Sequence, residues 1–129
     1  MKIEHLAIWS DDIETLRRFY ERYFNATSNE KYTNPAKGFS SYFLSFESET
    51  RLEVMQSDAM PGAVSEPDGH RLGFAHLAFS VGSRERVDQL TTELKQDGYR
   101  LLDGPRTTGD GYYESTILDP EGNRLEITI

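Results

Sequence analysis

Cysteine is absent from this 129-residue chain. Without thiols the protein cannot form disulfides, all-cysteine zinc sites, iron–sulfur clusters or a thiol nucleophile. Any metal site must therefore be built from His, Asp, Glu and other oxygen donors. Only three residues of the chain are His, so imidazole ligands are few.

Long apolar runs and an excess of basic residues are missing as well. No stretch approaches the roughly 18 apolar residues of a membrane span, and the N-terminus has no apolar signal-peptide core. We therefore expect a cytoplasmic protein without a membrane partner. With 14 Lys and Arg against 22 Asp and Glu, the net charge is -8, and such a surface repels nucleic acid.

Hydrophobic residues make up 36% of the chain and aromatic residues 12%. This composition is rich enough for a buried core, and the length suits one compact domain. We therefore expect residues 1–129 to form a single folded domain rather than a disordered chain.

Two short segments of the sequence occur twice. Residues 5–8 (HLAI) recur as residues 76–79 (HLAF), and residues 51–54 (RLEV) recur as residues 124–127 (RLEI). The separation of the two segments is nearly the same in both copies, which chance rarely produces. We interpret the chain as a tandem duplication.

The predicted elements of the two copies agree, and they indicate an α+β fold of two tandem β-α-β-β-β modules. Apolar alternation predicts the strands and apolar residues at helical spacing predict the helices. We expect module 1 at about 1–57, an exposed linker at 58–71 and module 2 at about 72–129. The expected strands are 3–9, 28–33, 39–47, 51–56, 73–81, 99–103, 111–118 and 123–128. The expected helices follow Asp12 and Ser83, the second closing at Gly98.

Each module carries one His on its first strand and one Glu on its last. Since side chains alternate along a strand, the apolar neighbours of these residues face the helix and the His and Glu face away. A pseudo-two-fold relation would then gather His5, Glu53, His76 and Glu126 into one cluster. Two imidazoles and two carboxylates suit one divalent ion, either Zn, Ni, Co, Mn or Fe.

The alternative interpretation is a purely structural role, because a lone His in a strand is usually a structural residue. The repeat favours a metal site, since packing does not require the same two polar types in both copies. His70 has no counterpart and is interpreted as a surface residue of the linker.

Other residues are candidates for binding a small-molecule substrate. Segment 106–113 contains glycine and aromatic residues, and it is either a lid over the site or an ordinary hairpin. Arg106 is the candidate for an anionic substrate group. The remaining candidates share the phase of the ligands or lie in that segment: Trp9, Arg51, Met55, Phe74, Tyr112 and Arg124.

These features resemble the vicinal-oxygen-chelate superfamily, and within it glyoxalase I-like proteins of the glyoxalase/bleomycin resistance protein/dioxygenase family. The likeness covers essentially the whole chain. It is best marked by residues 74–81 (FAHLAFSV) and 119–126 (DPEGNRLE). The resemblance implies a glyoxalase-like cup, one metal at the four named residues and a metal-chelated enediolate as the reacting species.

For function, the resemblance implies a lactoylglutathione lyase-like enzyme, a lyase or isomerase acting on a small thiol adduct or another α-oxygenated carbonyl compound. It implies Glu126 as the catalytic base and Glu53 as its pseudo-symmetric catalytic partner. It also implies a homodimer, with each site formed within one chain or shared between two.

Some positions depart from the family pattern. Glutathione-using members commonly carry Arg where Trp9 stands and Asn near Ser57. The residues that usually bind the glutathione carboxylate are therefore missing. The alternative function is a small-molecule binding or antibiotic-resistance protein of the bleomycin type. The retained set of four polar residues favours the enzyme.

Overall fold

The computed structural model describes residues 1–59 and 73–129. The chain divides into two compact units, Met1–Ala63 and Val64–Ile129. Most of the predicted linker, with His70, lies outside the described residues, so that prediction stays untested.

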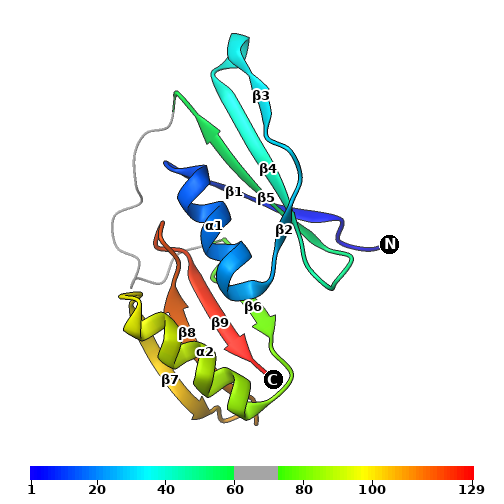
Figure 1. Cartoon of the computed structure of the whole chain (residues 1–129). Helices are drawn as coiled ribbons and strands as arrows, with labels where there is room; N and C mark the ends of the chain where they lie inside the picture. The colour runs from blue at the N-terminus through cyan, green and yellow to red at the C-terminus, as the bar shows by residue number, and fades with distance from the viewer. Residues whose placement is uncertain (60–72) are drawn as a thin grey trace. The chain divides into compact units, whose positions relative to one another are not determined.

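The N-terminal unit is a mixed sheet covered by one helix (Figure 1). The strand order is β1-β5-β4-β2, and β3 pairs with β4. β1 runs parallel to β5, whereas β4 is antiparallel to it. The elements are β1 (His5–Trp9), α1 (Ile13–Phe24), β2 (Thr27–Ser28), β3 (Tyr32–Asn34), the 3-10 helix η1 (Pro35–Lys37), β4 (Phe39–Ser45) and β5 (Arg51–Ser57).

The C-terminal unit repeats this plan with the strand order β6-β9-β8-β7. β6 runs parallel to β9, and the other pairs are antiparallel. In both units the first strand thus pairs with the last one in parallel. The elements are β6 (Leu77–Ser80), α2 (Arg84–Gln96), β7 (Leu101–Thr107), β8 (Tyr113–Leu118) and β9 (Arg124–Thr128). The predicted α+β fold with two repeated modules is confirmed.

Helix α1 begins where the sequence predicted. The Asp12 carboxylate accepts hydrogen bonds from the backbone N–H groups of Glu14 and Thr15, and this satisfies two of the free donors at the helix start. Asn25 ends the helix in the left-handed conformation, with φ of 53°. The buried side chains of the helix recur at helical spacing and contact β4 and β5: Ile13, Leu16, Phe19, Tyr20 and Tyr23.

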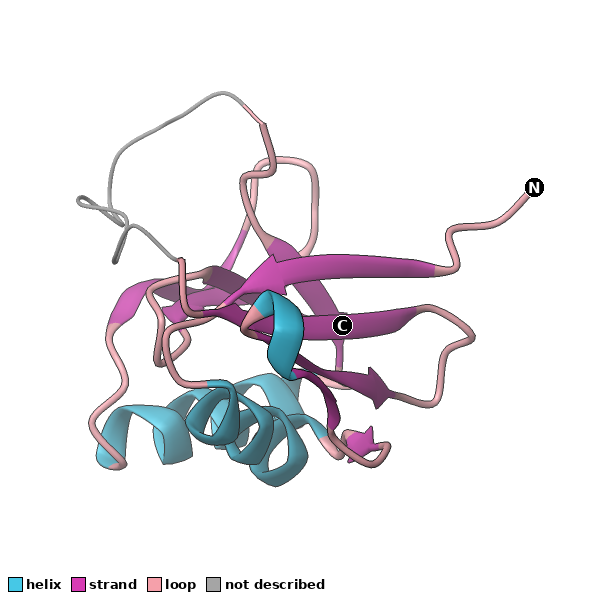
Figure 2. Ribbon diagram, turned by 90° about the horizontal axis from the view of Figure 1, so that it is seen from above, coloured by secondary structure: helices cyan, strands magenta, loops and turns pink. Residues whose placement is uncertain are grey.

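Helix α2 follows the same logic in the second unit. The Ser83 hydroxyl accepts from the N–H of Arg86 at 3.2 Å, and Gly98 follows the helix with φ of 93°. Val87, Leu90 and Leu94 are buried against the sheet. In each unit, therefore, the helix covers one face of its sheet and leaves the other face available for a site (Figure 2).

Most of the predicted strand boundaries agree with the structure to within two residues, and three strands differ more. The expected strand 28–33 is divided into β2 and β3, because Asn29 bonds to Phe43 with both its N–H and its side-chain oxygen. The expected strand 73–81 shortens to β6, which begins directly after His76. β7 extends to Thr107, since Arg106 and Thr107 still pair with β8.

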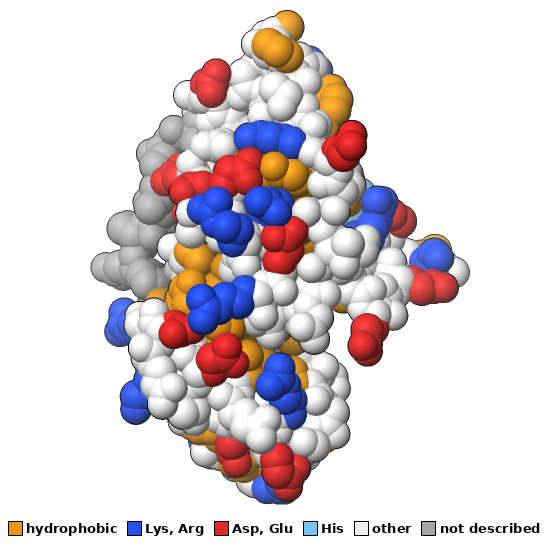
Figure 3. Space-filling view, in the orientation of Figure 1, with side chains coloured by type: hydrophobic (Ala, Val, Ile, Leu, Met, Phe, Trp, Pro, Cys, Tyr) orange, Lys and Arg blue, Asp and Glu red, His pale blue; other side chains and the backbone are white. Residues whose placement is uncertain are grey.

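The surface is charged, and many of its charges are paired. On the face shown in Figure 3, acidic and basic side chains lie side by side. On α1, Arg17 contacts Glu21 at 2.8 Å and Glu14 at 3.3 Å, and Glu14 also contacts Lys31 at 3.1 Å. Across residues 1–59 and 73–129 no helix is long and apolar enough to cross a lipid bilayer.

Candidate metal centre

The two repeats place their His and Glu residues in the same register. In the parallel pair β1–β5, Ala7 lies opposite Glu53, and in β6–β9, Ala78 lies opposite Glu126. His5, the first residue of β1, precedes Ala7 by two residues and so lies on the same sheet face as Glu53. His76 precedes Ala78 by two residues and lies directly before β6, with its ring near Glu126. The predicted pairing of one imidazole with one carboxylate therefore recurs in both units.

The two faces of β5 and β9 differ in how deeply their side chains are buried. Leu52 and Val54 of β5 are buried, whereas the Glu53 side chain between them is 16% exposed. On β9, Leu125 and Ile127 are fully buried. The apolar residues thus pack on the side of the helix, and the carboxylates lie on the opposite, partly open face.

In the N-terminal unit, the His5 ring contacts or lies near the side chains of Glu53, Glu4 and Phe43. Its Nε2 is 3.9 Å from Oε2 of Glu53, and its Nδ1 contacts the Glu4 carboxylate. Arg51 binds the other oxygen of Glu4 and lies over the Phe43 ring at 4.2 Å. The hydrogen bonds from His5 and then from Arg51 hold the pKa of the Glu4 carboxyl below its ordinary value.

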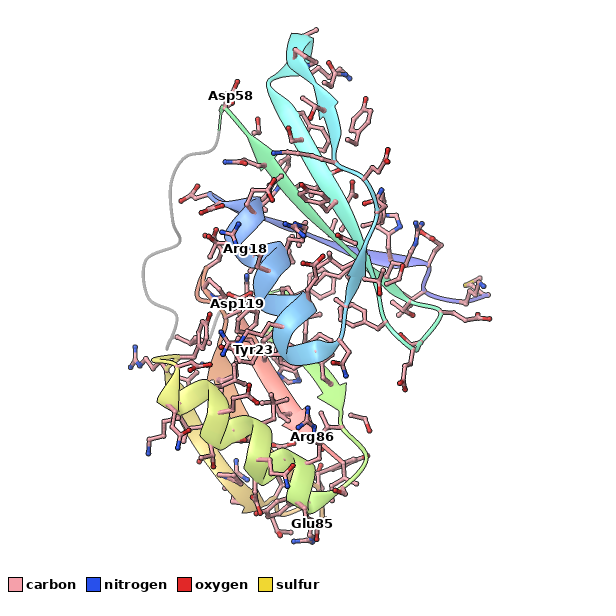
Figure 4. All side chains as sticks on the ribbon, viewed as in Figure 1. Arg18, Tyr23, Asp58, Glu85, Arg86 and Asp119 are labelled. Atoms are coloured by element: carbon pink, nitrogen blue, oxygen red, sulfur yellow. The ribbon has the colours of Figure 1, made fainter. Side chains whose placement is uncertain are left out.

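In the C-terminal unit, Nε2 of His76 lies 3.2 Å from Oε2 of Glu126. The strand that carries Glu126 is positioned by the turn after β8, where the sequence reads Asp-Pro-Glu-Gly. Asp119, which Figure 4 labels, is 4% exposed. Its carboxylate accepts hydrogen bonds from the backbone N–H groups of Glu121 and Asn123 and from the Asn123 amide. This buried carboxylate fixes the turn and hence the start of β9.

The donors of each unit are chemically suited to a divalent ion. An imidazole nitrogen and a carboxylate oxygen approach each other on a partly exposed face in both units, and both atom types ligate transition metals. Among the described residues, no three His, Asp or Glu side chains form a metal-binding group. Each unit supplies one His and one Glu, and their union in one centre stays a prediction.

The C-terminal unit also contains an open cleft of about 430 Å³ next to Glu126. The cleft is lined almost entirely by charged and polar side chains from β7, β8, β9 and the residue before β7. Its lining residues are Arg100, Leu102, Asp103, Arg106, Glu114, Thr116, Arg124 and Glu126. Two predicted substrate residues, Arg106 and Arg124, therefore share a cleft with the predicted base.

Arg106 is held within this cleft by an acidic neighbour. Its Nε donates to Oδ2 of Asp103 at 2.5 Å. This hydrogen bond and the negative charge of Asp103 raise the pKa of Arg106. The same hydrogen bond and the positive charge of Arg106 lower the pKa of Asp103. Arg106 is 48% exposed at its side chain, so it can still contact an anionic group in solution.

The sequence reading missed Glu114, another carboxylate of this cleft. Thr116 of β8 lies opposite Glu126, and Glu114 lies two residues away on the same face. Burial, followed by the negative charge of Glu126, raises the pKa of Glu114. The period-2 pattern of residues 113–118 would have revealed this position once the pairing of β8 with β9 was known.

The other predicted substrate residues lie on several elements. Trp9 is 49% exposed and packs edge-on against Phe39, with Met55 opposite it in the sheet. Phe74 is 84% exposed and precedes β6, and Tyr112 is 57% exposed. Arg51 is paired with Glu4, as described above.

The predicted lid, segment 106–113, is a β-hairpin end. Its first two residues belong to β7, and Tyr113 belongs to β8. The turn is closed by hydrogen bonds from Thr108 N–H to the Tyr112 carbonyl at 2.8 Å and from Gly111 N–H to the Thr108 carbonyl at 3.1 Å. The ordinary hairpin, the other alternative left open by the sequence, describes this segment.

Comparison with known proteins agrees with this arrangement. The sequence profile of the Glyoxalase/Bleomycin resistance protein/Dioxygenase superfamily matches residues 2–127. The chain belongs to this superfamily. The predicted resemblance is therefore confirmed for the family and for the fold.

Two relatives of this glyoxalase superfamily chain extend over almost all of it. An uncharacterised protein of Bacillus subtilis is 29% identical over 130 residues, covering 97% of this chain and 96% of the relative. A solved glyoxalase family protein of Enterococcus faecalis is 26% identical, with a TM-score of 0.78, and the match covers 99% of this chain and 97% of that one.

A third similar structure is the trypanothione-dependent glyoxalase I of Leishmania major. Its TM-score is 0.77, and the match covers 99% of this chain and 86% of that one. At 18% identity, this likeness shows the glyoxalase superfamily fold alone.

Proposed function

We propose that this protein is a metal-dependent lyase or isomerase of the glyoxalase I type, acting on a small thiol adduct or another α-oxygenated carbonyl compound. The observation that carries the proposal is the duplicated pair of His and Glu. Glu53 and Glu126 occupy equivalent register positions on the uncovered face of a sheet, and in each unit the His lies close to the Glu. Packing alone does not require the same two polar residues in both copies.

The residues that would hold the metal are His5, Glu53, His76 and Glu126, within one chain or between two chains. A bound Zn, Ni, Co, Mn or Fe ion would polarise substrate oxygens and favour negative charge on them. The cytoplasmic location predicted above stays part of this proposal.

Glu126 is the proposed base that accepts a proton from the substrate carbon next to the carbonyl. Its side chain is 21% exposed and lines the cleft of the C-terminal unit, so a substrate can reach its oxygens. Arg106 in the same cleft supplies a positive charge for an anionic group of the substrate. Glu53 has the equivalent position in the other repeat and is its proposed partner in proton transfer.

The thiol part of the substrate is proposed to differ from glutathione. An exposed Trp9 and a neighbouring Phe39 offer an apolar surface where a glutathione carboxylate would need a positive charge. The Leishmania major enzyme, which shares the fold, is trypanothione-dependent, so a glyoxalase I of this fold can use another thiol.

A binding protein of the bleomycin-resistance type is the second candidate. It is favoured by the aromatic surface of the N-terminal unit, where Tyr32 and Trp9 are 54% and 49% exposed and both pack against Phe39. Exposed rings of this kind can stack on a flat ligand.

The test combines metal analysis with an activity screen. Protein loaded separately with each of the five ions is assayed on methylglyoxal mixed with glutathione, cysteine and other small thiols. We expect about one ion per site and turnover with at least one thiol other than glutathione. A His5→Ala, His76→Ala double variant is the control. Full metal occupancy in that variant would refute the site, and a wild-type chain that never binds metal would support the binding protein.

A homodimer is part of the proposal. β1 and β6 each form an end of their sheet, and end strands have unpaired backbone groups that favour further pairing. We expect a two-fold symmetric dimer in sedimentation velocity at micromolar concentration. A monomer under these conditions would contradict it.

A further inference from the structure

The carboxylate of Glu4 bonds the ring nitrogen of His5 that faces away from Glu53. A carboxylate can only accept hydrogen bonds, so Nδ1 of His5 must donate the proton in this contact. When the ring is neutral, its Nε2 then has a free lone pair. That lone pair belongs to the nitrogen that lies 3.9 Å from Glu53, which is where a metal ligand is needed.

Further contacts hold Glu4 itself in place. Arg51 donates from its guanidinium to the second oxygen of Glu4. The same guanidinium lies 4.2 Å from the ring centre of Phe43. Phe43 in turn packs edge-on against the His5 ring, with a centroid distance of 5.3 Å and an angle of 88°. The four side chains therefore form a closed cycle of contacts around His5.

The cycle fixes more than the protonation of the ring. The Glu4 contact restrains the imidazole in its own plane, and the edge contact with Phe43 restrains its tilt. Phe43 lies opposite Glu53 in the β4–β5 pair. Phe43 therefore both positions the His5 ring and borders Glu53. Second-layer carboxylates that accept from a ligating imidazole have this orienting effect in many metal sites.

The two repeats differ at this point. Ala75 precedes His76 where Glu4 precedes His5, so the adjacent carboxylate belongs to the first copy only. The duplicated ligands are therefore identical in type, but their surroundings are not.

We propose that Glu4, held by Arg51, is a positioning residue that makes Nε2 of His5 the metal-binding nitrogen. This role rests on the proposed function, because it presupposes His5 as a ligand. Glu4 and Arg51 both lie outside the predicted ligand set, and Arg51 acts in this role without contact with substrate.

Two variants of Glu4 separate charge from hydrogen bonding. Glu4→Ala removes the acceptor, whereas Glu4→Gln retains an amide oxygen that can still accept from Nδ1. The matched control is Glu49→Ala, which removes another exposed carboxylate of the same unit, paired with Lys2 at 3.0 Å. Circular dichroism spectra check that each variant is folded.

The first measurement is the ring tautomer of His5 in metal-free protein, read from long-range nitrogen–proton NMR spectra at several pH values. We expect the Nδ1–H form in the wild type and in the Glu49→Ala control. Glu4→Ala should give a mixture of tautomers, and Glu4→Gln should largely preserve the wild-type form. An Nε2–H tautomer in the wild type, or an unchanged tautomer in Glu4→Ala, would overturn the proposal.

The second measurement is zinc affinity by competition with a chelator. Glu4→Ala should raise the zinc dissociation constant by about 10- to 100-fold, the effect typical of second-layer partners. Glu4→Gln should have a smaller effect and Glu49→Ala none. Unchanged affinity in Glu4→Ala overturns the positioning role. If the wild type takes up neither zinc nor any of the other four ions, the proposed function fails, while the tautomer spectra still decide whether Glu4 sets the ring.

Discussion

Nε2 of His76 lies 3.2 Å from Oε2 of Glu126, whereas the equivalent atoms of His5 and Glu53 are 3.9 Å apart. In both units the Glu lies on the last strand, which pairs in parallel with the first, and the His lies at or directly before the start of that first strand. The pair of the C-terminal unit is closer, and its Glu126 lines a cleft, so the proposed function gives this pair the leading part.

His76→Ala should therefore reduce metal binding strongly, because a ligand nitrogen is lost. Metal content after equilibration with zinc and a competing chelator measures the effect. Gln96→Ala, at the end of α2, is the control and should bind zinc as the wild type does. Equal zinc retention by His76→Ala would remove this residue from the ligand set.

Glu126→Gln should separate metal binding from proton transfer. The amide oxygen can still coordinate, but it cannot accept a proton at neutral pH. We therefore expect most of the metal to remain while turnover falls by on the order of 10²-fold or more. The assay uses the thiol adduct found by the screen, with metal content measured beside each rate.

Glu53→Gln is the internal comparison, and its effect on turnover should be milder. Near-normal turnover by metal-loaded Glu126→Gln would exclude Glu126 as the base, and the metal site would be unaffected by that result.

Arg106→Gln should weaken binding of an anionic substrate. A charge-assisted hydrogen bond contributes about 1.5–3 kcal/mol, so KM should rise roughly tenfold or more with little change in kcat. Steady-state kinetics on a charged and a neutral adduct tests this. Arg18→Gln on α1, whose side chain contacts Thr15 at 3.1 Å, is the matched control. An equal change of KM for both adducts would contradict an anion-binding role.

Glu14 should make stability depend on pH. Its carboxylate accepts from the Tyr42 hydroxyl at 2.8 Å and from Lys31 at 3.1 Å. These contacts, with Arg17, lower its pKa, the Tyr42 bond contributing most. Because the folded-state pKa is depressed, the stabilisation is present above the unfolded pKa and is lost as the pH falls through the folded value.

Glu14→Gln should accordingly lower the free energy of unfolding at pH 7 by at most about 1 kcal/mol, because the group is partly exposed and screened. The difference from the wild type should shrink in the acid range below the ordinary Glu pKa of about 4.3. Urea unfolding at pH 7 and pH 3 measures both values, with Glu49→Gln as the control. A deficit that grows towards pH 3 would contradict the assignment.

Much of the fold followed from local patterns in the sequence. The helix starts at Asp12 and Ser83 were predictable because capping oxygens and helical spacing are properties of neighbouring residues. The buried and exposed faces of β5 and β9 were predictable for the same reason, since strand alternation has a period of two. The repeat predicted the candidate ligands, because it matched His5 with His76 and Glu53 with Glu126.

Local pattern was insufficient where strand pairing decides the outcome. Asn29 interrupts a predicted strand through bonds to Phe43, a residue of another strand. Segment 106–113, for which the sequence left a lid and an ordinary hairpin open, is part of a hairpin because Arg106 pairs with Glu114. Both outcomes depend on contacts between strands, which the order of residues along one strand does not specify.

The sequence by itself determined the residue types, the duplication and the face on which each predicted ligand lies. Only the tertiary structure decided which strand lies beside which, and so brought His76 to 3.2 Å from Glu126 across 50 positions of the chain. It also decided that Arg51 binds Glu4 and that Glu114 shares a cleft with Glu126. The physical reason is that alternation along a strand is local, whereas sheet order and register arise from packing between distant segments.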